Sequence, residues 1–195
     1  MDEKIKLLIS ELGEIRVKQN IDIGDYLASK KSVQVRAFYL ATNIDELIKV
    51  ILLCQELEIN YLLIGSGSKI SFSDNNLKGL VIKNRCDNLK IFGIKGKVSR
   101  DGLGIQEATI EADAGISLQG LAAYTKKQLL TGLEDLERYP GTLGGSIFMN
   151  QTLRNYVHEL RVLDKSGKIV SKGLAELNSE DVILSVYFKL KSKPD

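Results

Sequence analysis

Apolar residues recur every three or four positions in several stretches of the chain, with charged residues between them, which is the pattern of amphipathic helices. The sequence therefore predicts helices over residues 2–18, 42–60 and 117–130. The second begins at Thr42 and carries Asp45 three residues later, an arrangement similar to a capping box. Ser117 is the expected N-cap of the third helix.

Strands are predicted where apolar residues alternate with polar ones or form short continuous runs. These runs cover residues 33–41, 61–64, 79–84, 89–96, 108–116 and 181–192. Residues 157–173 form two alternating runs around Lys165-Ser166-Gly167, which indicates a hairpin. In the last strand the residues expected near one face are Val182, Leu184, Val186 and Phe188.

The order of these elements predicts an α+β fold with two lobes. The first half reads strand, helix, strand and glycine-rich loop, which is typical of a small α/β lobe with a parallel strand pair. The second half is richer in strands. We expect an N-terminal helix in residues 1–19 and one domain over 20–195, with lobes over about 20–84 and 85–192.

Composition narrows the classes of function. The net charge is only +2, from 27 basic and 25 acidic residues, so nothing favours binding to nucleic acid or to an anionic membrane. The two cysteines, Cys54 and Cys86, have no metal-ligand spacing and are expected to be buried free thiols. With His158 as the single histidine, no metal site is expected. The sequence shows no signal peptide or membrane span, so a cytoplasmic protein is expected.

The segment Gly65-Ser66-Gly67-Ser68 follows the strand that ends at Ile64. Such a loop can turn backbone N–H groups and serine hydroxyls inward and so bind a phosphate or pyrophosphate. A turn that only needs positive φ explains the same glycines. The loop has neither the Lys-Ser/Thr pair of a P-loop nor the third glycine of a Rossmann fingerprint.

A second unusual segment, RYPGTLGGSIFMN (138–150), is poor in side chains and runs directly into apolar residues. Backbone without side chains can pass close to a flat ligand. The alternative is a bulge or a crossing between packed strands.

Taken together, these segments resemble the N-terminal, FAD-binding part of the UDP-N-acetylenolpyruvoylglucosamine reductase (MurB) family of peptidoglycan synthesis. The resemblance runs from about residue 20 to residue 191. In the first half it rests on Gly65, Ser66, Gly67, Ser68, Ser73, Asp74 and the segment 79–82. In the second half it rests on Ala114, Gly115, Gly132, Leu133, Glu134, Leu136, Pro140, Gly141, Thr142, Gly144, Gly145, Met149, Asn150 and the last strand.

The resemblance implies a two-lobed domain of the vanillyl-alcohol-oxidase type, with non-covalent FAD between the lobes. It implies that the 65–68 loop wraps the pyrophosphate and that the 140–145 segment lies along the pyrophosphate and the flavin edge. The cofactor-binding residues so implied are Gly65, Ser66, Gly67, Ser68, Lys69, Ser73, Asp74, Ala114, Gly115, Pro140, Gly141, Thr142, Gly144, Gly145, Asn150 and Ile183.

The sequence also departs from the family pattern. Arg138-Tyr139 replaces Gly-Ile, and Gln151 to Asn155 replace small residues, so we expect bulky side chains where flavin or substrate should approach. The family's Tyr-Arg-x-Ser stretch before the last strand has no counterpart, and the family's third, substrate-binding domain is not in this sequence. No catalytic residue can therefore be assigned.

Three functions remain open. The chain is a shortened flavoprotein whose substrate is bound by a partner chain or whose flavin is covered by an oligomer. The second function is that of a UDP-N-acetylmuramate dehydrogenase whose missing domain is encoded separately or absent from this sequence. The third function is that of a degenerate relative that has lost FAD and acts as a binding or structural protein. The bulky Arg138, Tyr139 and Leu153 favour the third function over the second, whereas the intact glycine pattern of 140–150 and the 65–68 loop favour the first over the third.

Overall fold

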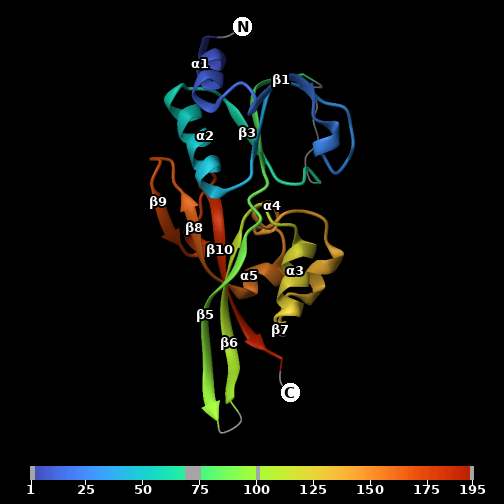
Figure 1. The fold of residues 1–195 in the computed structure, drawn as a ribbon, viewed down its shortest axis with the longest axis vertical. Coiled ribbons are helices and arrows are strands. Elements are labelled where there is room, and N and C mark those ends of the chain that lie inside the picture. Colours follow the sequence, from blue (N-terminus) through green and yellow to red (C-terminus); the bar gives the residue numbers. More distant parts are fainter. Residues whose placement is uncertain (1–2, 69–75, 100–101, 194–195) are drawn as a thin grey trace. The chain divides into compact units, whose positions relative to one another are not determined.

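The computed structural model describes residues 3–68, 76–99 and 102–193. They form two compact units, Met1–Cys86 and Asp87–Asp195, which are described separately. Figure 1 labels the elements of both. The mixture of helices and sheets agrees with the expected α+β class.

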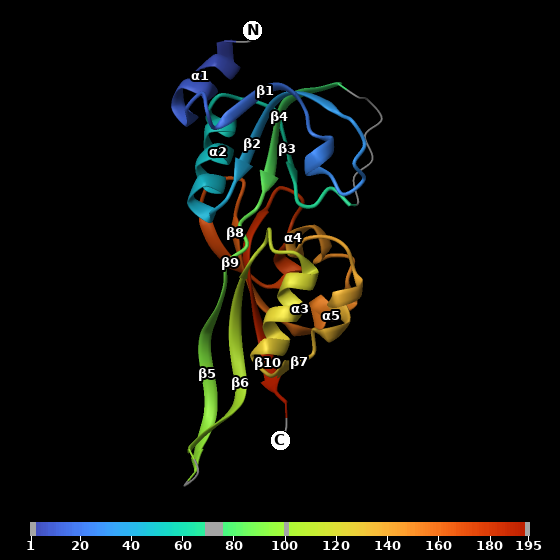
Figure 2. The same ribbon diagram turned by 45° about the vertical axis from the view of Figure 1, so that its right-hand side comes forward.

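Unit 1 is built on a four-stranded sheet in the order β1-β2-β4-β3 (Figure 2). The strands are β1 (Val17–Asp22), β2 (Gln34–Ala41), β3 (Tyr61–Ile64) and β4 (Asn76–Asn84). Both β2 and β3 run parallel to β4, which lies between them, and β1 is antiparallel to β2. The expected parallel arrangement is confirmed, but β2 and β3 are not direct neighbours.

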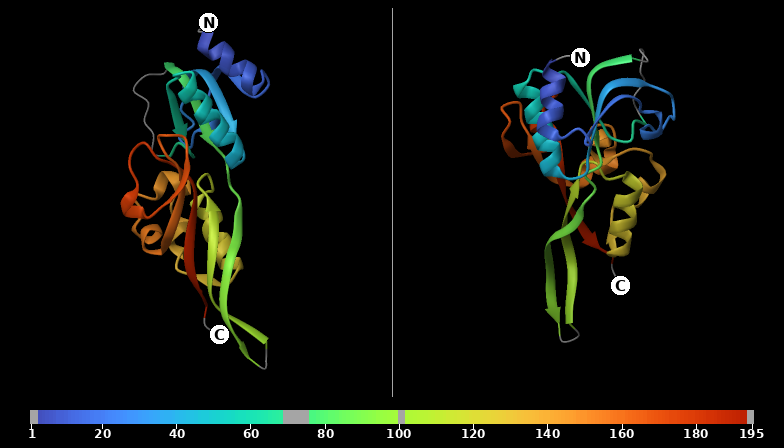
Figure 3. Two further views of the ribbon diagram at one scale, coloured as in Figure 1. Left: turned by 90° about the vertical axis from the view of Figure 1, so that its left-hand side faces the viewer. Right: turned by 45° about the horizontal axis from the view of Figure 1, so that its top comes forward.

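The helices of unit 1 are α1 (Glu3–Leu12) and α2 (Ile44–Glu56), which are seen next to each other in Figure 3. The expectation of one helix over 2–18 is wrong, because Gly13 has φ +92° after Leu12 and residues from Val17 on pair with β2. The N-cap of α2 is Asn43, not Thr42: its side-chain oxygen accepts a hydrogen bond from Glu46 N at 2.9 Å. Thr42 instead donates to the Glu46 carboxylate.

One core of unit 1 contains buried apolar side chains from β2, β3, β4 and the segment between β1 and β2. They are Ile23, Leu27, Val33, Val35, Phe38, Ile64 and Val81. The single-turn helix η1 (Gly24–Tyr26) lies in that segment. The residues that α2 buries are Leu47, Val50, Ile51 and Cys54, in agreement with its helical apolar stripe.

Unit 2 contains an antiparallel sheet in the order β5-β6-β10-β8-β9, with β7 also paired to β10. Its strands are β5 (Leu89–Ser99), β6 (Gly102–Asp113), β7 (Leu130–Thr131), β8 (Val157–Leu163), β9 (Ile169–Lys172) and β10 (Val182–Ser192). Strands β5 and β6 form a long hairpin (Figure 3). The predicted hairpin over 157–173 is confirmed as β8 and β9, whereas residues 114–116, expected in a strand, form a turn.

The helices of unit 2 pack on one face of this sheet (Figure 2). They are α3 (Leu118–Lys127), η2 (Glu134–Arg138), α4 (Leu143–Ser146) and α5 (Gln151–Tyr156), with η3 (Leu174–Glu176) after β9. Ser117 is the N-cap of α3, as expected, since its hydroxyl accepts from Gly120 N at 3.0 Å. The core includes Ile110, Leu121, Leu153 and Phe188. None of the helices in the described ranges is long and apolar enough to cross a membrane.

Candidate functional site

The 65–68 loop follows β3 in unit 1 and is fastened to the Tyr26–Ala28 segment. Ala28 N donates to Ser66 O at 2.9 Å, and the Ser66 and Ser68 hydroxyls lie 3.0 Å apart. Gly67 has φ +69°, and a Cβ built there would lie 2.7 Å from Leu27 Cδ2. The local fold therefore already requires glycine at 67, whether or not a ligand approaches it.

Lys83, which is not among the predicted site residues, lies next to this loop. Its ammonium donates to Gly65 O at 2.9 Å and to Tyr26 O at 2.6 Å, and the residue is only 6% exposed. Burial lowers the pKa of Lys83, and the charge of Arg85 lowers it further. The two serine hydroxyls and this ammonium form a donor set suited to an anionic group such as a diphosphate.

The second half of the predicted site lies in unit 2, where the Ala114–Gly115 turn, the segment after Pro140 and the start of β10 meet. Ala114 N donates to Leu184 O at 2.9 Å, beside Ile183, and Gly144 N donates to Ala114 O at 2.8 Å. Leu118 N donates to Gly141 O at 3.1 Å, and Thr142 forms a bridge with Ser117. The structure thus brings together residues predicted from three distant parts of the sequence.

The glycines of this segment differ in what surrounds them. Gly141 has φ +128°, which favours glycine. A Cβ on Gly144 would lie 3.1 Å from Ala114 Cβ and 3.2 Å from Ala114 O. A Cβ on exposed Gly145 would meet only Thr142 Oγ1, at 3.3 Å. The positive φ explains Gly141, and packing within unit 2 explains Gly144. Gly145 is left as the position where a ligand could pass the backbone.

The bulky residues that we expected near the flavin differ in their exposure. Leu153 is fully buried in the core of unit 2, so its interpretation as an obstacle to flavin is wrong. Asn150 is the N-cap of α5, and its side-chain oxygen accepts from Leu153 N at 3.1 Å. Tyr139, Phe148 and Met149 are exposed.

Three other predicted site residues, Lys69, Ser73 and Asp74, lie outside the described residues. Within the described ranges, no group of three or more His, Cys, Asp or Glu side chains is arranged to hold a metal. His158 and Arg154 are exposed, and the structure assigns neither to a site.

A buried polar cluster precedes the Ala114–Gly115 turn on β6. Glu111 accepts hydrogen bonds from Lys90 at 2.8 Å and from Ser185 at 3.1 Å. Burial raises the pKa of Asp113, although hydrogen bonds from Asn88 partly offset the effect. Asn88 contacts Asp113 through its side-chain and backbone N–H groups, at 3.2 and 3.3 Å. These contacts fix the strand ends that carry the turn.

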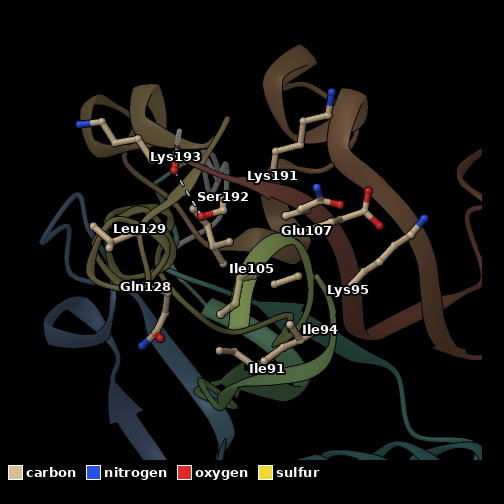
Figure 4. Close-up of a pocket in the computed structure, with 14 residues that line it drawn as sticks. Ile91, Ile94, Lys95, Ile105, Glu107, Gln128, Leu129, Lys191, Ser192 and Lys193 are labelled. Atoms are coloured by element: carbon tan, nitrogen blue, oxygen red, sulfur yellow. Dashed lines mark hydrogen bonds between the residues drawn. The ribbon is translucent and has the colours of Figure 1, made fainter. Parts of the chain in front are cut away.

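A hollow of about 780 Å³ lies elsewhere in unit 2, between the β5–β6 hairpin, the end of α3 and the end of β10 (Figure 4). Ile91, Ile94 and Ile105 line it, and Lys95, Lys191 and Lys193 surround it. None of the predicted site residues lines this hollow. The candidate site consists of the 65–68 loop in unit 1 and, described separately, the loops of unit 2 that carry the predicted residues. Their hydrogen-bond donors and close-packed glycines are what a dinucleotide needs.

Comparison with known proteins agrees with these observations. A family model described as FAD binding domain matches residues 35–173. The UDP-N-acetylenolpyruvoylglucosamine reductase of Lachnoclostridium phytofermentans is 28% identical over 188 residues, which cover 92% of this chain and 56% of the relative. The same enzyme of Protochlamydia amoebophila is 31% identical over 147 residues, covering 72% and 44%. The chain thus spans about half the length of the curated relatives it matches.

Two solved structures are similar in fold. The reductase MurB from Thermus caldophilus has a TM-score of 0.68 at 19% identity, covering 92% of this chain and 64% of that chain. p-Cresol methylhydroxylase has a TM-score of 0.60 at 13% identity, covering 98% and 43%. At these identities the likeness shows the fold alone, and it confirms the expected α+β fold.

Proposed function

Because this chain belongs to the FAD-binding domain family, we propose that it is the cofactor-binding part of a flavin-dependent reductase similar to UDP-N-acetylenolpyruvoylglucosamine reductase. The observation that carries the proposal is the family match over residues 35–173, which includes the 65–68 loop and the Ala114–Gly144 contact. FAD supplies hydride transfer when bound.

The chain's own residues would serve to bind and orient this cofactor. In unit 1, the hydroxyls of Ser66 and Ser68 and the N–H groups of their loop would donate to the pyrophosphate. In unit 2, the exposed backbone at Gly145 would allow an approach that a side chain would hinder. The buried contacts of Ala114 and Gly144 would keep that backbone in place.

We further propose that the substrate is bound outside these residues, on a partner chain or in a further part of the protein. The relatives are nearly twice as long as the part this chain matches, so a second binding surface is needed for a comparable reaction. A non-enzymatic relative that has lost FAD is the alternative. Leu153 no longer supports that alternative, because its side chain lies in the core.

A flavin titration of the purified chain tests the proposal. We expect the fluorescence of FAD to change on binding and this change to saturate as the chain is titrated. FAD should also raise the melting temperature of the chain by mass action. Riboflavin, which has no diphosphate and no adenine, is the matched control ligand and should bind far more weakly. A chain that neither carries nor takes up FAD would contradict the proposal and favour the non-enzymatic alternative.

A further inference from the structure

Lys83 has an environment that is unusual for a lysine. It lies on β4, two residues after Val81, so both side chains project from the same face of the sheet. Val81 belongs to the apolar core of unit 1, whereas the Lys83 ammonium donates hydrogen bonds to two backbone carbonyls. A lysine is almost never buried without a partner of opposite charge.

The two carbonyls belong to two different segments. One carbonyl belongs to Gly65, the first residue of the 65–68 loop, and the other belongs to Tyr26, the last residue of η1. The same two segments are also joined by the Ala28 N to Ser66 O bond and by the packing of Gly67 against Leu27. Lys83 therefore holds the first residue of the loop, directly after β3, by a hydrogen bond from the interior of unit 1.

The charge of Lys83 is not compensated by any described carboxylate. In the ranges 3–68, 76–99 and 102–193, no ion pair of Lys83 is present, and exposed Arg85 adds a second positive charge nearby. Carbonyl oxygens satisfy hydrogen bonds but cancel no net charge, so burying this ammonium is costly. An anion at the loop would reverse that cost.

We propose that Lys83 is a positioning residue for the diphosphate of FAD, holding the 65–68 loop in its binding shape and supplying buried positive charge beneath it. The inference rests on the proposed function. An ammonium has three N–H donors, and the described contacts use two of them. The diphosphate is the part of FAD whose charge this ammonium matches.

A purely structural role makes a different prediction, and three substitutions separate the two roles. Lys83→Met removes both the charge and the donors at similar length. Lys83→Gln keeps two N–H donors and removes the charge. Lys83→Arg keeps the charge and the donors. If Lys83 acts only by hydrogen-bonding the two segments together, Lys83→Gln should bind FAD as the wild type does. If the charge of Lys83 acts on the diphosphate, Lys83→Gln should bind FAD more weakly.

The experiment measures affinity for FAD, ADP and adenosine, with a thermal melt of each ligand-free variant. We expect Lys83→Met and Lys83→Gln to weaken the binding of FAD and ADP by about tenfold or more, the loss typical of a charge-assisted contact. Adenosine binding should be unchanged in these variants, and Lys83→Arg should keep most of the FAD affinity.

The outcomes also distinguish this inference from the proposed function. If the wild type binds FAD and the folded Met and Gln variants bind it equally well, only the role of Lys83 is overturned. A wild type that binds neither FAD nor ADP overturns both. If all three variants fail to fold, Lys83 is a folding residue and the inference is wrong.

Discussion

Gly144 donates its backbone N–H to the carbonyl of Ala114 at 2.8 Å, across 30 residues of sequence. This contact joins the start of α4 to the turn after β6, and it leaves 3.1 Å between Ala114 Cβ and the place where a Gly144 side chain would begin. The glycine-rich segment is therefore fixed by packing within unit 2 before any ligand is considered.

Gly144→Ala should destabilise unit 2. The new Cβ would lie within 3.2 Å of both Ala114 Cβ and Ala114 O, and backbone cannot give way as a flexible side chain can. We expect a loss of about 1–3 kcal/mol, the usual cost of overpacking, measured by urea denaturation. Gly93→Ala is the matched control, because nothing lies within 4 Å of its new Cβ. Equal stability of the two variants would refute this reading of the contact.

Gly145→Ala tests whether a ligand passes the same segment. Its Cβ would meet only Thr142 Oγ1, so we expect a stability change within about 0.5 kcal/mol, as for surface positions. FAD affinity should nevertheless fall several-fold, because the added methyl occupies the proposed path of the flavin. If both stability and affinity are unchanged, the cofactor does not approach the backbone at Gly145.

Much of the fold could be predicted because the local signals and the tertiary structure agree. Ser117 caps α3 as expected, and the hairpin over 157–173 follows its turn residues. The boundary of α1 was misjudged because Ile15 continues the helical spacing, yet it is 94% exposed and follows the positive φ of Gly13. Spacing cannot reveal that β1 gains partners in β2, about twenty residues later.

The candidate site was predictable only as motifs. The glycines at 65–67 and 141–145 mark loops, but the sequence does not say whether packing or a ligand requires them. Gly67 and Gly144 turn out to have close neighbours within their own units. Lys83 was missed because lysine in an apolar strand normally indicates a solvent-facing position. The shared face of Val81 and Lys83 was the one available signal.

Asp181 and Lys172 should stabilise unit 2 in a pH-dependent way. The Asp181 side chain is 1% exposed, and Lys172 Nζ lies 2.8 and 2.9 Å from its two oxygens. Burial alone would raise the pKa of Asp181, but hydrogen bonds from Lys172 and Asn178 N lower it overall. A lowered pKa in the folded state gives stability that is present above the unfolded pKa and is lost as pH falls through the folded value.

Asp181→Asn should therefore cost about 2 kcal/mol at pH 7, the range for hydrogen bonds to charged groups, and progressively less in acid below about pH 4. Glu180→Gln is the control, since its pair with Lys165 spans 3.6 Å and is exposed on both sides. Urea denaturation at pH 7 and at pH 3 measures the free energy of unfolding that each variant loses. A loss of equal size at pH 7 and pH 3 would show that charge is not its cause.

FAD should be bound without a covalent link. Covalent attachment through a cysteine needs a reactive thiolate. Cys54 and Cys86 are both buried, and burial raises the pKa of Cys54 to about 12. His158 is the single histidine of the sequence. After denaturation and ultrafiltration, the yellow flavin should pass through the filter, and the chain that is retained should have its unmodified mass. Flavin retained with the chain would identify a tether.

The isolated chain should not reduce UDP-N-acetylenolpyruvoylglucosamine at a useful rate. Reduction of an enol ether needs an acid within hydrogen-bond reach of the carbon that is protonated. Asp113, which directly precedes the Ala114–Gly144 contact in sequence, is buried and hydrogen-bonded to Asn88. Losing one well-placed acid or charge stabiliser costs on the order of a hundred- to a thousandfold in rate. Much of the substrate's binding surface should lie outside the chain as well, since it spans about half of its relatives.

Formation of the reduced product UDP-N-acetylmuramate is the measurement that decides. Consumption of NADPH is not sufficient, because a bound flavin can pass electrons to oxygen without touching the substrate. The control is a reductase of full length, such as the one from Lachnoclostridium phytofermentans, assayed with the same FAD and NADPH. We expect product from the control and none above background from this chain. Product at a comparable rate would mean that this chain holds its own proton donor. Tyr139 and His158, both exposed, would then be the first residues to substitute, because each can carry a transferable proton.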